Sequence, residues 1–209
     1  QPLGLGLNDV ARTLAVYNNE LVAGGDFTTA GGISANRIAK WNGSAWSVLG
    51  LGVNNSVYAL ANVNNELIIG GSFTSVGGVS VNRIAKWNGS WAGFGTGMNG
   101  SVFSLTAYSG TGGFLAGGNF TTAGGIGANR LAVWNGSNWS TLGTGMSGGD
   151  PIEVLSIAVY GTLPYAGGDF TMAGGTMVNN ISRWGSTVGV PGTGNETPGQ
   201  RRLPSAVDQ

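Results

Sequence analysis

Hydrophobic and polar residues alternate along the chain in short runs that are separated by turn residues. Strand-like runs are joined by Asn-Asn, Gly-Gly and Asn-Gly pairs, which tolerate the positive φ angles of tight hairpin turns. No segment keeps a 3.6-residue period, so helices are not expected. The pattern is clearest in one stretch that predicts four antiparallel strands, at residues 57–61, 66–73, 82–87 and 90–94.

This four-strand pattern occurs four times. Successive Gly-Gly-x-Phe phrases are 46, 47 and 50 residues apart, and a Trp follows each Phe by fourteen residues. Four strands in about 47 residues, repeated, predict an all-β fold, a β-propeller with four blades. We expect the repeated aromatic side chains to form the blade core: Phe27, Phe73, Phe120, Phe170, Trp41, Trp87, Trp134 and Trp184.

The repeat phase predicts the domain organisation. Residues 1–186 form the propeller, with units at about 8–49, 54–94, 99–142 and 147–186. The sequence of residues 3–7 is nearly the same as that of residues 49–53, so residues 1–7 are interpreted as a detached outer strand. The last unit lacks a fourth strand, and the N-terminal strand is expected to complete it. The donor is either the same chain, which closes a ring and removes exposed edges, or a neighbouring chain, which produces head-to-tail assembly.

Both ends of the chain are therefore candidates for contact between copies. Residues 187–209 are rich in Pro and Gly and have the composition of a linker. We expect this tail to lie extended along a neighbouring protomer or over its own propeller. The predicted assembly interface consists of Gln1, Pro2, Leu3, Leu5, Leu7, Val188, Val190 and Leu203.

Composition excludes several functions. The chain has no Cys and no His, which removes thiol chemistry and the commonest general base and metal ligand. Nine basic and nine acidic residues balance, so no electrostatic attraction to nucleic acid is expected. No apolar run has the roughly 18 residues of a membrane helix. We expect no membrane insertion, no cofactor and no metal site.

Some polar residues still allow alternatives. Asp26 and Asp169 share a repeat position and would be neighbours in a closed ring, where two carboxylates could cleave a glycan. Arg37, Arg83 and Arg130 also recur, and would either bind anionic glycans or satisfy polar groups between blades. Asn-x-Ser/Thr phrases serve as turns or, on a secretory route, as glycosylation sites at Asn42, Asn88, Asn99, Asn135, Asn138 and Asn195.

The phrase at residues 70–78, followed by Asn82-Arg83-Ile84-Ala85, resembles the secreted bacterial β-propeller repeats of the delta-60 and kelch-like type. The resemblance spans roughly residues 3–186 and implies a propeller fold and an extracellular or cell-surface location. We predict a non-enzymatic structural protein that binds copies of itself head to tail, with fibres as one product. The alternatives are a monomeric propeller that binds carbohydrate or protein, and a glycan-cleaving enzyme.

Overall fold

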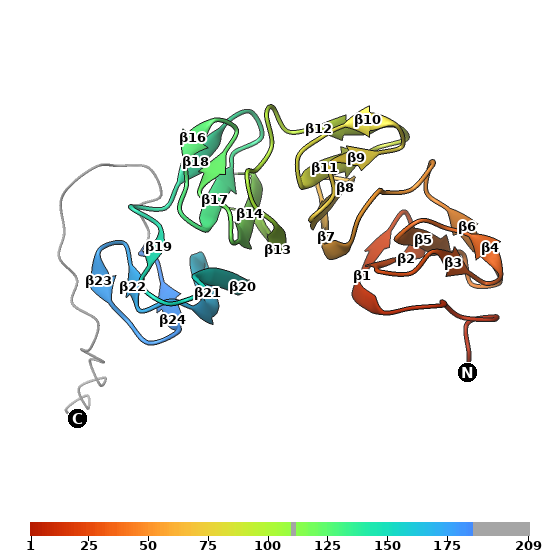
Figure 1. Cartoon of the computed structure of the whole chain (residues 1–209), viewed down its shortest axis with the longest axis horizontal. Helices are drawn as coiled ribbons and strands as arrows, with labels where there is room; N and C mark the ends of the chain where they lie inside the picture. The colour runs from red at the N-terminus through yellow and green to blue at the C-terminus, as the bar shows by residue number, and fades with distance from the viewer. Residues whose placement is uncertain (110–111, 186–209) are drawn as a thin grey trace, which may run out of the picture.

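The computed structural model of the protein describes residues 1–109 and 112–185. Every secondary-structure element in these two ranges is a β-strand, and most of the strands form four antiparallel sheets (Figure 1). Together with the repeat, this architecture makes the chain an all-β protein built from propeller blades.

Each sheet is one blade, and the blades are numbered along the chain. Blade 1 contains β1 (Ala11–Tyr17), β2 (Glu20–Gly25), β5 (Ile38–Trp41) and β6 (Trp46–Val48). Blade 2 contains β7 (Val57–Val63), β8 (Glu66–Gly71), β11 (Ile84–Trp87) and β12 (Trp91–Gly93). Blade 3 contains β13 (Val102–Tyr108), β14 (Gly113–Gly118), β17 (Leu131–Trp134) and β18 (Trp139–Thr141). Blade 4 contains β20 (Glu153–Tyr160), β21 (Leu163–Asp169) and β24 (Ile181–Arg183).

A small hairpin interrupts every blade after its second strand. The hairpins pair β3 (Thr29–Ala30) with β4 (Ile33–Ser34), β9 (Ser75–Val76) with β10 (Val79–Ser80), β15 (Thr122–Ala123) with β16 (Ile126–Gly127), and β22 (Met172–Ala173) with β23 (Thr176–Met177). In the last blade β19 (Met146–Ser147) pairs with β22. Single bridges occupy the same place in the other blades and link Leu7 to Ala30, Val53 to Val76, and Met98 to Ala123.

Connectors carry the chain from one blade to the next, at residues 49–53, 94–98 and 142–146. The first strands β1, β7, β13 and β20 lie next to one another in that order. They line the inner side of an arc in which blade 1 and blade 4 occupy opposite ends (Figure 1). The closed ring considered from the sequence is therefore not the arrangement in this structure.

The N-terminal segment also differs from its prediction as an outer strand. Leu3 corresponds to Leu49, which follows the fourth strand β6, so residues 3–7 repeat a connector and not a strand. The segment lies against blade 1, where the Trp46 Nε1–H donates to the Leu3 carbonyl at 2.9 Å. It does not complete blade 4, which has three strands in the described part of the chain.

The repeated aromatic residues occupy two environments. All four Phe side chains are fully buried. The repeated Trp side chains are half-buried. In blades 1 to 3 each packs against a second Trp of the same blade, with ring centroids 5.0–5.5 Å apart. The Phe residues therefore belong to the buried core, whereas the Trp pairs are half-buried on the outer strands.

Candidate interaction surface

The blades meet at a repeated junction built on one glycine. A Cβ added at Gly24 would lie 2.6 Å from Val57 Cγ1 of the next blade. At Gly70 the corresponding distance to Val102 Cγ1 is 2.6 Å, and at Gly117 the distance to Val154 Cγ1 is 2.5 Å. Only a residue without Cβ leaves room for this valine, so the glycine makes a slot that the next blade fills.

Hydrogen bonds set the register of these junctions. The Leu60 N–H donates to Thr13 Oγ1 at 3.1 Å, and the Ile157 N–H donates to Ser104 Oγ at 3.0 Å. The connectors add a second recurring bond, from the last residue of each connector to a carbonyl of the preceding blade. These N–H···O distances are 3.0 Å for Val53 to Asn36, 3.0 Å for Met98 to Asn82 and 2.9 Å for Met146 to Asn129.

The hydrophobic core lies mainly at the junctions. Three of its clusters combine residues from consecutive blades, with Tyr17 joining Leu60, Val63 joining Phe114, and Tyr108 joining Ile157. Because each cluster needs two blades, the blade at either end of the arc has a sheet face that no described residue covers in the same way.

In blade 4 the sheet face that carries the slot glycine is uncovered. Tyr160 corresponds to Tyr108 of blade 3 and is 80% exposed, whereas Tyr108 is 4% exposed. Ile181 is 65% exposed, whereas its counterpart Leu131 is 1% exposed. Gly167 holds the position of the slot glycine, but its added Cβ would meet only Ser156 Oγ and the Asn180 carbonyl within 4 Å. We call the surface around Tyr160, Gly167 and Ile181 the blade 4 end face.

In blade 1 the opposite sheet face is uncovered, which in the other blades supplies the valine that fills the slot. Leu14 is 59% exposed, whereas its counterpart Leu60 in blade 2 is 8% exposed. Ala11 is exposed and occupies the position at which the other blades carry a buried valine. The connector-like segment beside it is also open, since a Cβ added at Gly6 would meet nothing within 4 Å. We call the surface around Leu7, Ala11 and Leu14 the blade 1 end face.

The structure places the predicted assembly residues only partly on this surface. Gln1, Pro2, Leu3 and Leu5 are exposed, and Leu7 is half-buried. The predicted residues Val188, Val190 and Leu203 belong to the tail at 187–209 and lie outside the described residues, as does Asn195. Sequence reasoning missed Leu14, Tyr160, Gly167 and Ile181. The repeat could have revealed them, because each occupies a repeat position whose counterparts in the other units lie at a junction.

The two repeated carboxylates are not brought together. Asp26 follows β2 in blade 1, Asp169 ends β21 in blade 4, and these blades lie at opposite ends of the arc. Asp26 instead accepts a hydrogen bond from Arg12 Nε at 2.8 Å. Within residues 1–109 and 112–185 no three acidic residues gather into a group that could hold a metal ion. No helix in those ranges is long and apolar enough to span a membrane.

The Arg12 guanidinium lowers the pKa of Asp26 through its hydrogen bond, and the Ser56 hydroxyl adds to this effect against the opposing effect of burial. A carboxyl whose folded pKa lies below its unfolded value stabilises the fold above the unfolded pKa, and this stability is lost as pH falls through the folded pKa. We expect Asp26→Asn to lower the free energy of unfolding by under about 1 kcal/mol near pH 7, since the pair is partly exposed to solvent. Urea denaturation should show this difference vanish below the folded pKa; a difference that persists there would contradict the assignment.

The repeated arginines adopt an unusual backbone conformation. Arg37, Arg83 and Arg130 have φ angles of 61°, 61° and 65°, and Asn180 at the same position has 62°. Their carbonyls accept hydrogen bonds from the second glycine of each Gly-Gly pair. Arg83 Nη1 also donates to the Met98 carbonyl of the next connector at 3.2 Å. Asn tolerates this left-handed conformation, which gives a physical reason for the substitution in blade 4.

Several of the sequon asparagines make hydrogen bonds, either within their own turn or to a neighbouring segment. Asn99 Oδ1 accepts from the Thr121 and Thr122 N–H groups, and its Nδ2 donates to Thr121 Oγ1. Asn42 and Asn135 each accept two N–H groups of their own hairpin turn. Asn88 Nδ2 donates to Glu66 at 3.3 Å, and Asn138 is exposed with its N–H bonded to Asn135. Asn42 and Asn135 therefore stabilise their own hairpin turns, as one of the two interpretations from the sequence expects.

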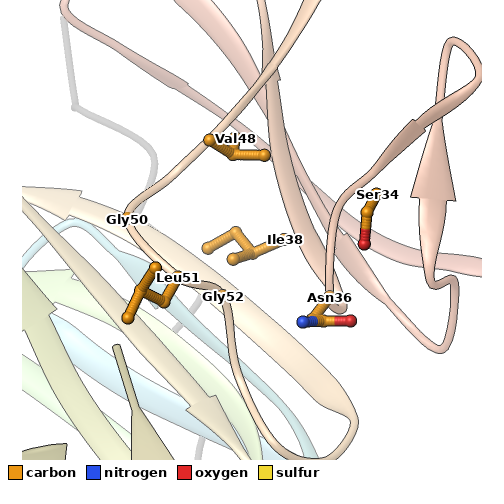
Figure 2. A pocket seen from close by; sticks show the side chains of 7 residues that line it. All are labelled: Ser34, Asn36, Ile38, Val48, Gly50, Leu51 and Gly52. Carbon is orange, nitrogen blue, oxygen red and sulfur yellow. The ribbon is translucent and has the colours of Figure 1, made fainter. Parts of the chain in front are cut away.

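A small cavity of about 250 Å³ lies beside the connector from blade 1 to blade 2. Figure 2 shows its lining, which comprises Ser34, Asn36, Ile38, Val48, Gly50, Leu51 and Gly52. None of these side chains is charged, and the volume is below the roughly 300–1,000 Å³ of typical ligand sites. The cavity is therefore small and lined only by uncharged side chains.

Comparison with known proteins supports the fold. Residues 64–91, which run from the β7–β8 turn into β12, match a family described as a domain of unknown function (DUF5122) beta-propeller. No curated protein matches the chain. The chain is thus a β-propeller repeat protein by its architecture and by this similarity, and the end faces are its most distinctive surface.

Proposed function

We propose that this protein is a non-enzymatic structural protein that assembles head to tail through the two ends of its blade arc. One observation carries the proposal: apolar residues that are buried in every internal junction are exposed on the two end faces, with opposite halves at opposite ends. Exposed apolar surface of this kind is a recurrent mark of protein–protein contact.

The two halves differ, so the contact between copies is heterologous. Such a contact closes into a ring when the rotation between copies returns to its start, and otherwise continues into a fibre. Both products are made from the same junction. The proposed role is therefore a building block, and its partner is another copy of the chain.

We place this building block outside the cell or on its surface, on the basis of the resemblance of its repeat to secreted propeller proteins. Asp26 and Asp169 lie in blades at opposite ends of the arc, so these two repeated carboxylates do not form the pair that glycan cleavage would require, and this separation favours the structural role. A structural role also fits the balanced charge, which does not favour nucleic acid or anionic lipid as a partner.

Self-association can be tested on the purified chain. We expect the mass from light scattering after size exclusion to rise with concentration above the 21.0 kDa of one chain. Leu14→Asp should shift the protein to monomer, because burying a Leu contributes about 1.5–3 kcal/mol and a buried carboxylate opposes association. Leu51→Asp is the matched control, since Leu51 is also an exposed leucine, at 78% against 59% for Leu14, but lies on the connector between blades 1 and 2.

A 21.0 kDa particle at every concentration would overturn the proposal. It would favour the alternative of a monomeric propeller that binds carbohydrate or protein. Equal effects of Leu14→Asp and Leu51→Asp would also count against the end faces, because they would show a general response to an added charge.

A further inference from the structure

We infer that blade 1 of a second copy packs on blade 4 in the same register as the internal junctions, with Ala11 over the Gly167 slot. This inference rests on the proposed self-assembly and specifies its geometry. In each internal junction the first-strand valine approaches the slot glycine, and at Gly70 and Gly117 the Leu or Ile three residues later approaches it as well. Ala11 and Leu14 hold these two positions in blade 1.

The polar groups of the end faces are in place for the same register. Ser156 faces Gly167 across β20 and β21, as Thr13 faces Gly24 and Ser104 faces Gly117. Thr13 and Ser104 each accept the N–H of the leucine or isoleucine of the next blade. In the inferred contact the Leu14 N–H of the second copy donates to the Ser156 hydroxyl.

The connector position repeats this correspondence. Asn179 of blade 4 aligns with Asn36, Asn82 and Asn129, whose carbonyls accept an N–H from the connector that follows. Leu7 aligns with the donors Val53, Met98 and Met146 and pairs with its own hairpin as they do. The Leu7 N–H of the second copy therefore donates to the Asn179 carbonyl. Two hydrogen bonds and one apolar insertion then define a single register.

One residue departs from the internal pattern. Ala11 is smaller than Val57, Val102 and Val154, so it fills the slot over Gly167 less completely. The contact between copies is therefore weaker than the contact between blades, because fewer atoms leave water and fewer pack against the slot. Assembly can reverse on dilution while each chain remains folded.

This departure gives a gain-of-function test. Ala11→Val restores the internal side chain and should tighten self-association about tenfold, as expected for two further buried carbon atoms. Ala45→Val is the control, because Ala45 lies in an exposed turn of the same blade. Sedimentation equilibrium gives both dissociation constants. An unchanged or weakened constant for Ala11→Val, with folding intact by circular dichroism, would overturn the register.

Disulfide trapping tests the register independently. The chain has no Cys, so any disulfide must come from the introduced residues. A Cβ added at the internal slot glycines lies 3.0–3.1 Å from the valine Cβ, which is a few tenths of an ångström shorter than the Cβ···Cβ distance of disulfides. Mixed Ala11→Cys and Gly167→Cys chains should form a linked dimer on oxidation, whereas neither variant should do so alone. The double variant Gly70→Cys/Val102→Cys is the positive control, because it tests the same geometry within one chain. Ser44→Cys mixed with Gly167→Cys is the negative control.

The outcomes separate this inference from the proposed function. If the unmodified chain associates but the Ala11 and Gly167 variants do not crosslink and Ala11→Val has no effect, the register is wrong while self-assembly stands. Crosslinking of Ala11→Cys with itself would replace the head-to-tail contact by a symmetric one. If the unmodified chain stays monomeric, both ideas fail.

Discussion

Replacing Gly70 with alanine should destabilise the folded chain by about 1–3 kcal/mol, the usual cost of overpacking a filled site. The new Cβ would lie 2.6 Å from Val102 Cγ1 and 3.0 Å from Val102 Cβ, so blades 2 and 3 must separate or distort. The backbone of Gly70 does not require glycine, because its φ is not among the positive values. The whole loss therefore comes from contact with the next blade. Chemical denaturation would measure it.

Gly167→Ala is the matched control and should behave differently. Its added Cβ meets only Ser156 Oγ at 3.0 Å and the Asn180 carbonyl at 3.8 Å, so it causes no clash with another blade of the same chain. Replacing glycine by alanine at a permitted conformation stabilises by about 0.4–1 kcal/mol through the unfolded state. At low protein concentration we expect a neutral or slightly stabilising effect. Equal destabilisation by both variants would show that the slot at Gly70 is not the cause.

Phe120→Ala should have the largest effect of any single change considered, at about 3–5 kcal/mol. The ring is completely buried and packs in the core cluster shared by blades 2 and 3, together with Ile84 and Met98. Truncation leaves a cavity that two β-sheets cannot easily close, because their strands are fixed by hydrogen bonds. Thermal or urea unfolding gives the measurement.

Ile126→Ala in the same blade is the comparison, since Ile126 is exposed on the small hairpin. It should change the free energy of unfolding by no more than about 0.5 kcal/mol, as surface substitutions usually do. A loss below about 1 kcal/mol for Phe120→Ala would mean that the ring is not held in the core as the structure shows.

The blade architecture could be predicted from the sequence because its signals are local. Asn-Asn and Gly-Gly turns between apolar runs defined the strands, and the structure confirms the all-β fold with repeated antiparallel sheets. The number of residues between Phe73 and Phe120 likewise gave the length of one blade unit. Such features depend on residues close together along the chain, and periodicity reports them directly.

Other features depend on contacts between units and were missed or misjudged. The alignment of Leu3 with Leu49 was correct. The sequence alone, however, does not show where a strand ends and the connector after it begins. The curvature that keeps blades 1 and 4 apart arises from packing geometry, which no single unit encodes. Gly24 and Gly117 looked like turn or strand glycines, whereas their role is to accept a side chain from the next blade.

The junctions also determine how the molecule responds to stress. Each interior blade is coupled to two neighbours, while blades 1 and 4 are coupled to one each among the described residues, so the chain behaves as a one-dimensional array with nearest-neighbour coupling. We therefore expect loss of structure to begin at the outer blades and to move inward. When a second copy covers an outer blade, that blade acquires the coupling of an interior one. Polymer growth and resistance to unfolding would then increase together.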